Sequence, residues 1–313
     1  MTTRSGTRCA ALVLALMVVG GCTEEPSVAP PTAGAAHPSL PATDIVPVER
    51  VRAPTLVAAG DISPAHIGGQ QATSDLVLAL DPTRVLVLGD QQYDNGTLDE
   101  YRAYYDPTWG RFKQRTRPTP GNHEYNTSGA AGYFSYFGAV ARPHGSSYYS
   151  FDLPGWHLIS LNSNIDHATG SVQDQWLRRD LRRTSQRCVL AFWHHPRFSS
   201  GHDHGNSPAV APFWRALYRH RADLVLNGHL HAYERFAPQT PSAQASAGGI
   251  REFVVGTGGA SHHAFAAPQP NSRKRITGTF GVLRLVLRPQ AYLWSFIDTS
   301  GTVLDSGGPY RCH

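Results

Sequence analysis

Residues 84–93 read RVLVLGDQQY, and this stretch decides the fold class. A continuous apolar run of this length is typical of a strand that is buried on both faces. Gly89 then allows the backbone to turn sharply, and Asp90 and Tyr93 follow it. Ligand sites in open α/β sheets gather at the carboxyl ends of the strands. The stretch therefore predicts an α/β protein with a polar site at the end of this strand.

Short apolar runs of the same kind recur along the chain and alternate with helical patterns. The predicted strands span residues 55–59, 84–88, 156–161, 188–193, 223–226, 251–255, 280–287 and 291–297. The predicted helices span 73–80, 172–181 and 210–218. Apolar and polar residues alternate at 282–288, which indicates antiparallel edge strands with one face more exposed to water. Ser171 with Asp174 resembles a capping box at the start of a helix. We predict a layered α/β/β/α sandwich with two mixed β-sheets flanked by helices, formed by one domain over residues 54–313.

Composition narrows the class of protein. The 313 residues are 41% hydrophobic and 10% aromatic, which excludes disorder throughout, while 30 Gly and 23 Pro exclude a coiled coil. The formal net charge is +5, but no basic stripe is interleaved with aromatic residues. We therefore expect no nucleic-acid binding beyond possible nucleotide substrates. The 16 histidines, by contrast, indicate metal or proton chemistry.

Residues that can bind metal ions follow four of these apolar runs and a shorter run at 117–121. They are Asp61; Asp90 with Tyr93; Asn122 with His123; His194 with His195; and His229 with His231. One such residue alone is usually a cap or a core side chain, but the same feature at five segments is improbable as a coincidence. The set exceeds the ligands of one tetrahedral zinc site and contains no cysteine. Two cations that share one carboxylate fit it, and carboxylate mixed with imidazole favours iron, manganese or zinc.

The same segments carry a family resemblance. Their motifs are GDIS at 60–63, GDQQY at 89–93, GNHE at 121–124, WHHP at 193–196 and GHLH at 228–231. In this order they resemble the calcineurin-like metallophosphoesterases, and within that superfamily the short-form purple acid phosphatases. Most of the superfamily has a metal-binding histidine where this chain has Ser63, and Tyr93 is placed to replace it, as in the purple branch.

The resemblance implies two metal sites with a shared ligand. The first site would contain Asp61, Asp90, Tyr93 and His231, and the second would contain Asp90, Asn122, His194 and His229. We expect Fe³⁺ in the first site and Fe²⁺, Zn²⁺ or Mn²⁺ in the second. A phenolate suits ferric iron, because a hard trivalent ion lowers the pKa of the phenol.

The resemblance also implies hydrolysis of phosphate monoesters through a metal-bound hydroxide that attacks phosphorus in line. His123 would face the substrate and protonate the leaving alkoxide. His202 and His204, in a polar loop, are either further substrate contacts or solvated loop residues. We expect His195 to point away from the metals, because neighbouring strand residues face opposite sides. The glycine-rich tract 256–263 is expected to form a rim loop over the site.

Other functions could use the same residues. A phosphodiesterase or a nucleotidase would keep the metal ligands, and the substrate-facing loops would distinguish these enzymes from a monoesterase. A non-catalytic surface lipoprotein that binds metal or another ligand would be expected to lose ligands. Only the position of Ser63 departs from the superfamily pattern here, so we expect an enzyme that acts on a phosphorylated small molecule.

The amino terminus resembles a bacterial lipoprotein signal. An arginine-containing start precedes an apolar stretch at 10–19 that is too short to span a bilayer. The sequence VGGC, which ends at Cys22, resembles the lipobox and implies cleavage before Cys22 and lipid attachment to its sulfur; an ordinary secretory signal is the alternative. We expect a signal peptide at 1–21 and a Pro- and Ala-rich tether at 22–53. The exported protein would face the extracytoplasmic side, held to the membrane only by Cys22.

Two cysteines remain for the folded part. Cys9 would leave with the signal peptide and Cys22 would carry the lipid, so Cys188 and Cys312 remain in a chain exported to an oxidising compartment. They form one disulfide or stay as two buried thiols, and we favour the disulfide.

Changing Cys22 tests the lipoprotein hypothesis. Cys22→Ala removes the sulfur that would carry the lipid, so we expect the protein to leave the membrane or to keep its signal peptide. Immunoblots of membrane and soluble fractions, with wild type beside the variant, measure both results. Membrane attachment of a processed Cys22→Ala protein would contradict lipidation at this residue.

Overall fold

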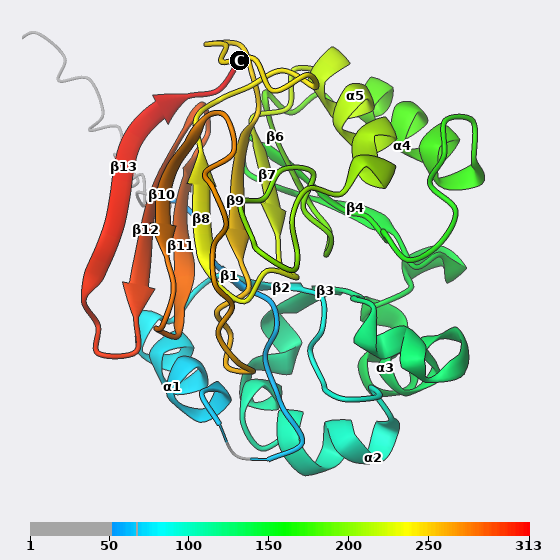
Figure 1. Cartoon of the computed structure of the whole chain (residues 1–313). Helices are drawn as coiled ribbons and strands as arrows, with labels where there is room; N and C mark the ends of the chain where they lie inside the picture. Colours follow the sequence, from blue (N-terminus) through cyan, green and yellow to red (C-terminus); the bar gives the residue numbers. More distant parts are fainter. Residues whose placement is uncertain (1–51, 67) are drawn as a thin grey trace, which may run out of the picture. The chain divides into compact units, whose positions relative to one another are not determined.

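Two mixed β-sheets form the centre of the part of the chain that the computed structural model describes, residues 52–66 and 68–313 (Figure 1). The first sheet, in the order β13-β12-β11-β1-β2-β3, contains β1 (Thr55–Ala59), β2 (Arg84–Leu88), β3 (Thr116–Thr119), β11 (Gly281–Arg288), β12 (Ala291–Asp298) and β13 (Val303–Arg311). The second, in the order β10-β8-β9-β7-β6-β5-β4, contains β4 (Tyr149–Leu153), β5 (Trp156–Ser160), β6 (Cys188–Phe192), β7 (Leu224–Asn227), β8 (Tyr233–Phe236), β9 (Arg251–Val255) and β10 (Ser272–Ile276). The predicted signal peptide and Cys22 lie outside the described residues.

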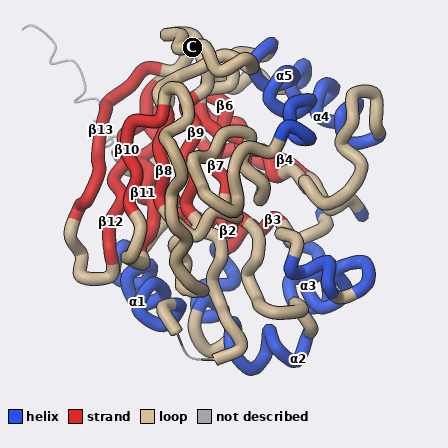
Figure 2. Tube along the Cα trace, in the orientation of Figure 1, coloured by secondary structure: helices blue, strands red, loops and turns tan. Residues whose placement is uncertain are grey.

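Helices lie outside the strands (Figure 2). The α-helices are α1 (Gln70–Leu80), α2 (Leu98–Glu100), α3 (Ala131–Phe137), α4 (Val172–Arg183) and α5 (Ala211–Arg219). The shorter helical turns are η1 (Tyr101–Tyr105), η2 (Trp109–Arg115), η3 (His123–Asn126), η4 (Ser128–Ala130), η5 (Gly138–Val140), η6 (Pro143–Gly145) and η7 (Pro208–Val210). Within the described residues, no helix combines the length and the apolar character that crossing a membrane requires.

Each sheet combines parallel and antiparallel strands. β1, β2 and β3 are parallel to one another, as are β5, β6, β7 and β9. The remaining pairs, such as β1 with β11 and β8 with β9, are antiparallel. Parallel neighbours end at the same edge of a sheet, so the residues that follow β1 to β3, and those that follow β6 and β7, are brought together. The predicted fold class is confirmed.

The two sheets face one another through a shared hydrophobic core. Along β6 the side chains alternate: Leu190 and Phe192 join the core that contains Leu283 of the first sheet, whereas Val189 and Ala191 join a second core with residues of α4 and α5. Both faces of β6 are therefore buried, which explains its continuous apolar sequence. Burial of each large apolar side chain contributes about 1.5–3 kcal/mol to stability.

Two of the long helices begin where the sequence predicts. α4 begins after Ser171, whose side chain accepts a hydrogen bond from the backbone N–H of Asp174 at 3.1 Å. Pro212 lies in the first turn of α5. Backbone N–H groups in the first turn have no partner within the helix, so the N–H that proline lacks costs no hydrogen bond. Val172 departs from the predicted apolar face, because its side chain is 74% exposed, whereas Leu177 is buried.

Some strand predictions need correction. The alternating strand β11 is antiparallel as predicted, but it lies between β12 and β1 and is not an edge strand. β4, β8, β10 and β13 have no counterpart among the predicted strands. β13 contains Gly307, Gly308 and Pro309, residues that weaken or interrupt a strand. It forms at the edge of its sheet, where one side of the backbone needs no partner strand.

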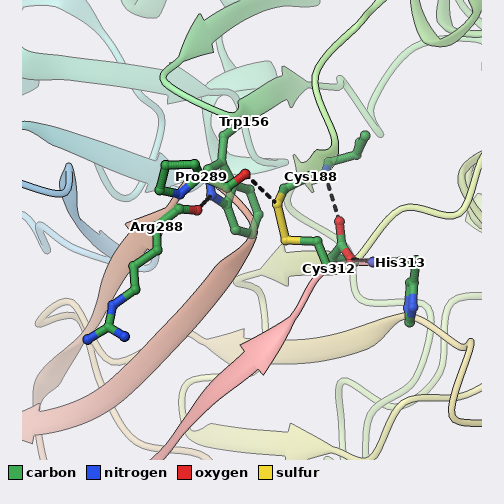
Figure 3. Close-up of a disulfide and its surroundings, with 8 residues drawn as sticks. Trp156, Cys188, Arg288, Pro289, Cys312 and His313 are labelled. Carbon is green, nitrogen blue, oxygen red and sulfur yellow. Dashed lines mark hydrogen bonds between the residues drawn. A yellow bond between two sulfur atoms is a disulfide. The ribbon is translucent and has the colours of Figure 1, made fainter.

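A disulfide joins the two sheets at the amino end of β6 (Figure 3). It connects Cys188, the first residue of β6, with Cys312, which follows β13, across a sequence separation of 124 residues and a Cα–Cα distance of 5.4 Å. The predicted pairing is confirmed, and the bonded sulfurs are not available to a metal ion. The Asp223 carboxylate strengthens this junction, because it accepts hydrogen bonds from the backbone N–H groups of Val189 (2.8 Å) and His313 (2.8 Å).

Removing the disulfide should lower the stability of the protein. The double variant Cys188→Ala/Cys312→Ala releases a long closed loop, and we expect the free energy of unfolding to fall by about 2–4 kcal/mol. Urea unfolding followed by tryptophan fluorescence measures the change. Mass spectrometry of non-reduced tryptic peptides is the control, because wild type should yield the cross-linked pair. Two freely alkylated thiols in the native protein would contradict the bond.

Candidate metal centre

The predicted ligands lie on loops that leave the strand ends of both sheets. Asp61, Asp90 and Asn122 follow β1, β2 and β3 of the first sheet, whereas His194 and His229 follow β6 and β7 of the second. Asp61, Asp90 and His229 have left-handed backbone conformations, with φ of 59°, 48° and 72°. Such a conformation costs about 1–3 kcal/mol at a residue other than glycine, so the surrounding structure must maintain it. These three strained positions lie where side chains from the two sheets meet.

One cluster of side chains gathers around the hydroxyl of Tyr93. The Tyr93 Oη atom lies 2.9 Å from Asp61 Oδ1 and 3.0 Å from His231 Nε2. It also lies 3.2 Å from Asp90 Oδ2. The Nδ1 atom of His231 is 2.6 Å from the Ser261 hydroxyl, and its Nε2 atom is directed at the cluster. The structure thus brings together the four residues predicted for the first metal.

A second cluster gathers around the Nε2 atom of His194. This atom lies 3.1 Å from Asn122 Oδ1 and 3.2 Å from Asp90 Oδ2. The Nδ1 atom of His229 is 3.2 Å from the same nitrogen. The Nδ1 atom of His194 donates to the Leu88 carbonyl at 2.9 Å, so in the neutral ring Nε2 keeps its lone pair toward the cluster. These are the four residues predicted for the second metal.

The Asp90 Oδ2 atom belongs to both clusters, because it lies 3.2 Å from Tyr93 Oη and 3.2 Å from His194 Nε2. Asp61, Asp90 and His194 are almost completely buried, and one ligand atom from each lies within 4.8 Å of the others. The carboxylate and imidazole groups direct their lone pairs into the same buried space, and positive charge between them offsets the cost of this arrangement. The donor set of carboxylate, phenol, amide and imidazole therefore fits a dinuclear metal site.

The pKa values of these groups also indicate that positive charge stabilises the clusters. Burial raises the pKa of Asp90, but the His194 imidazole outweighs this effect and lowers the pKa well below its ordinary value. Burial likewise opposes the charge on His194, yet the Asp90 carboxylate raises its pKa to about 9. Burial, followed by the charge of Asp61, raises the pKa of Tyr93 well above its ordinary value, so its phenolate form requires a cation.

A buried carboxylate outside the ligand set holds the Asp90 loop. Glu124 Oε1 accepts hydrogen bonds from the backbone N–H groups of Gln91 (2.9 Å) and Gln92 (3.2 Å). Its Oε2 atom accepts from those of Asp90 (3.0 Å) and Gly121 (2.7 Å). Burial raises the pKa of Glu124 to about 7. Gly121 has no room for a side chain, because a Cβ atom there would overlap the Asp90 carboxylate.

His123 lies beside the first cluster and is partly exposed. Its Nδ1 atom donates to the backbone carbonyl of Asp94 at 2.8 Å, and its ring centroid lies 4.2 Å from that of Tyr93. Its Nε2 atom is 4.0 Å from Asp90 Oδ2, and the side chain is 29% exposed. The His123 ring is thus held against the ligands, and its Nε2 atom makes no hydrogen bond to the backbone. This arrangement suits the predicted role of His123 as a proton donor to the leaving group.

The structure brings one of the two loop histidines to the clusters. The ring centroid of His204 lies 4.2 Å from that of His229. Glu234 fixes the loop, because it accepts hydrogen bonds from the backbone N–H (2.7 Å) and the hydroxyl (2.5 Å) of Ser200. His202 is instead 70% exposed, and its Nδ1 atom lies 2.6 Å from an Asp203 carboxylate oxygen. The structure therefore favours the solvated-loop interpretation for His202.

His195 lies closer to the clusters than the sequence predicts. Its ring centroid is 4.4 Å from that of His229, and one nitrogen each of His194, His195 and His229 lies within 4.8 Å of the others. β6 ends at Phe192, so strand alternation no longer applies at His195, and the prediction that it points away is wrong. Its Nδ1 atom is 2.8 Å from the Ser163 hydroxyl, and burial, together with the charge of His194, lowers its pKa to about 3.

Sequence reasoning misses two residues that contact His231. Ser261 is hydrogen-bonded to its Nδ1 atom, and the ring of His263 stacks on its ring, with centroids 3.9 Å apart and an interplanar angle of 8°. Both residues lie in the tract 256–263, for which the sequence predicts only a rim loop. The signal that could have found them is the His pair that follows β9 and its glycine-rich loop.

Known proteins are similar to this chain in sequence. Purple acid phosphatase 21 of Arabidopsis thaliana is 30% identical over 224 residues, which cover 63% of this chain and 51% of the relative. Probable purple acid phosphatase 20 of the same plant is 28% identical over 218 residues, which cover 54% of this chain and 51% of the relative. The chain thus spans about half the length of the curated relatives it matches.

The fold is shared with a solved structure. The purple acid phosphatase PPD1 from yellow lupin (Lupinus luteus) seeds superimposes with a TM-score of 0.68 at 19% identity, covering 81% of this chain and 53% of that chain. The profile of the family named calcineurin-like phosphoesterase matches residues 54–233, which is more than half of the chain and includes every residue of both clusters. The chain therefore belongs to the calcineurin-like phosphoesterase family.

Proposed function

We propose that this protein is a binuclear metal-dependent hydrolase of phosphate monoesters. The observation that carries the proposal is the Asp90 Oδ2 atom, which lies 3.2 Å from Tyr93 Oη and 3.2 Å from His194 Nε2 and can therefore serve two metal ions. Family membership supports the hydrolysis of phosphoric esters, and the purple acid phosphatase relatives support a monoester substrate. The substrate would be a phosphorylated small molecule.

The protein's own residues would hold and orient the metals. Asp61, Asp90, Tyr93 and His231 would hold Fe³⁺, and Asp90, Asn122, His194 and His229 would hold Fe²⁺, Zn²⁺ or Mn²⁺. When bound, such ions lower the pKa of a water molecule and neutralise the charge that develops on the phosphoryl group. Ser261 orients His231, the Leu88 carbonyl orients His194, and Glu124 fixes the Asp90 loop.

Two imidazoles outside the ligand set would act on the substrate. The Nδ1 atom of His123 is engaged by the Asp94 carbonyl, so in the protonated ring the Nε2–H group is free to protonate the leaving alkoxide. The ring of His204 packs against that of His229, and it would donate a hydrogen bond to a phosphoryl oxygen. No side chain needs to form a covalent bond to phosphorus in this scheme.

We also propose that the protein acts outside the cytoplasm as a lipoprotein attached through Cys22. The lipobox-like sequence VGGC supports cleavage and lipidation. The Cys188–Cys312 disulfide supports an oxidising compartment, because reducing compartments keep most thiols unpaired.

Hydrolysis of p-nitrophenyl phosphate and of its bis ester tests the activity. Protein stripped with a chelator would be assayed before and after addition of iron, Zn²⁺ or Mn²⁺. We expect metal-dependent hydrolysis with a higher kcat/KM for the monoester. A higher kcat/KM for the bis ester would indicate a phosphodiesterase. Metal binding without hydrolysis of either ester would indicate the non-catalytic alternative.

Changing Tyr93 tests the identity of the first metal. A phenolate bound to ferric iron absorbs visible light by charge transfer, so the iron-loaded wild type should be coloured. Tyr93→Phe removes one oxygen and should abolish the colour, while the circular dichroism spectrum stays unchanged. Asp90→Ala removes the shared ligand and should empty both metal sites. Inductively coupled plasma mass spectrometry of the purified variant measures the bound metals.

A colourless wild type with full activity and no iron would defeat the assignment of Tyr93 as a phenolate ligand. The two-metal proposal would then remain, with zinc, manganese or calcium in the first site. Loss of only one metal equivalent from Asp90→Ala protein would argue against a shared carboxylate.

Changing His123 tests the proton donor. His123→Ala should keep the metals but lower kcat by roughly 10²–10⁴-fold, because a positioned general acid contributes about that much. The loss should be larger for an alkyl phosphate than for p-nitrophenyl phosphate, whose leaving group departs without a proton. His202→Ala is the matched control, because that exposed residue pairs with Asp203 and should have wild-type kcat. Equal kcat in all three proteins would rule out the role of His123.

A further inference from the structure

His263 lies against the metal centre without belonging to either ligand cluster. Its ring stacks on that of His231, with centroids 3.9 Å apart and an interplanar angle of 8°, and it lies 4.8 Å from the ring of His204. The backbone N–H of His263 donates to the His231 carbonyl at 3.0 Å. The Thr277 hydroxyl donates to the His263 carbonyl at 2.6 Å. The hydrogen bonds therefore fix the backbone at His263, and the stacking places its imidazole against the ring of His231.

The hydrogen bonds of the His263 ring determine where its proton lies. The backbone N–H of His231 points at the Nδ1 atom of His263 at 3.4 Å, a long contact that favours an Nδ1 without a proton. The neutral ring must then carry its proton on Nε2. Among the residues that the structure describes, none accepts a hydrogen bond from this Nε2–H group. The chain thus presents a free N–H donor beside a metal ligand.

We propose that His263 binds the phosphoryl group of the substrate by donating its Nε2–H to a phosphoryl oxygen, an inference that rests on the proposed function. The rings of His204 and His263 are neighbours, and they pack on His229 of the second cluster and His231 of the first. This side of the site therefore adjoins both clusters. Both rings are only partly buried, so an anion can reach them. An ionised phosphate offers acceptors, for which imidazole N–H groups are suitable donors.

The neighbouring His262 provides a matched control. Its ring packs against Phe280, with centroids 4.2 Å apart, and the residue is exposed. Removing either imidazole takes the same side chain from the same loop, so a general effect on the loop would appear in both variants. Only His263 stacks on a predicted metal ligand. A difference between the two variants therefore reports the specific position of His263.

The test measures the binding of inorganic phosphate to metal-loaded protein by isothermal titration calorimetry, a readout that does not depend on turnover. We expect His263→Ala to weaken phosphate binding about tenfold or more, because a hydrogen bond to a charged group is lost. His263→Gln should restore part of the affinity, because its side-chain amide supplies an N–H donor. His262→Ala should bind phosphate as wild type does. All variants should retain the wild-type metal content.

Equal phosphate affinity in wild type and His263→Ala would overturn the inference, and so would a wild type that binds no phosphate. Loss of metal from His263→Ala would also overturn it, because the ring would then serve to position His231. The proposed function fails in a different way. Protein that binds phosphate through His263 but hydrolyses neither p-nitrophenyl ester supports the inference and contradicts the proposed activity.

Discussion

The shared carboxylate oxygen of Asp90 imposes the strongest constraint on this structure. A phenol and an imidazole approach the same buried oxygen, and positive charge on the imidazole or on a bound metal ion stabilises the carboxylate there. The surrounding structure holds these side chains in place. Buried parallel strands deliver the side chains, Glu124 holds the loop backbone, and Gly121 leaves room for the carboxylate. Because each cluster contains ligands from both sheets, the packing of one sheet on the other determines whether the ligands of a cluster meet.

The left-handed backbones at Asp61, Asp90 and His229 show where stability is lost for the sake of the site. Each costs about 1–3 kcal/mol, which is comparable with the gain from burying one large apolar side chain. Glycine would relieve the cost at any of these positions but would remove a ligand. The two hydrophobic cores offset this strain.

The central strands and their ligands could be predicted because both depend on local sequence. β2 is apolar from Val85 to Leu88 since both of its faces are buried, and Asp90 follows close behind. β13 could not be predicted, because its Gly and Pro residues argue against a strand unless the sheet edge is known. The contacts of Ser261 and His263 were harder to predict than the residues themselves. The His pair at 262–263 is visible in the sequence, but the contacts of this loop with His231 depend on a fold-back across about 30 residues, which no local pattern specifies.

The disulfide and the ligand clusters lie at opposite ends of one strand. Cys188 is the first residue of β6, and His194 follows its last residue, so each end of the strand is connected to the first sheet. One connection is covalent and responds to reductants, whereas the other consists of metal-ligand side chains and would respond to chelators when metal ions are bound. The sandwich is therefore fastened at two points by independent chemistries. Loss of one fastening would leave the other, together with the shared hydrophobic core, to keep the two sheets aligned.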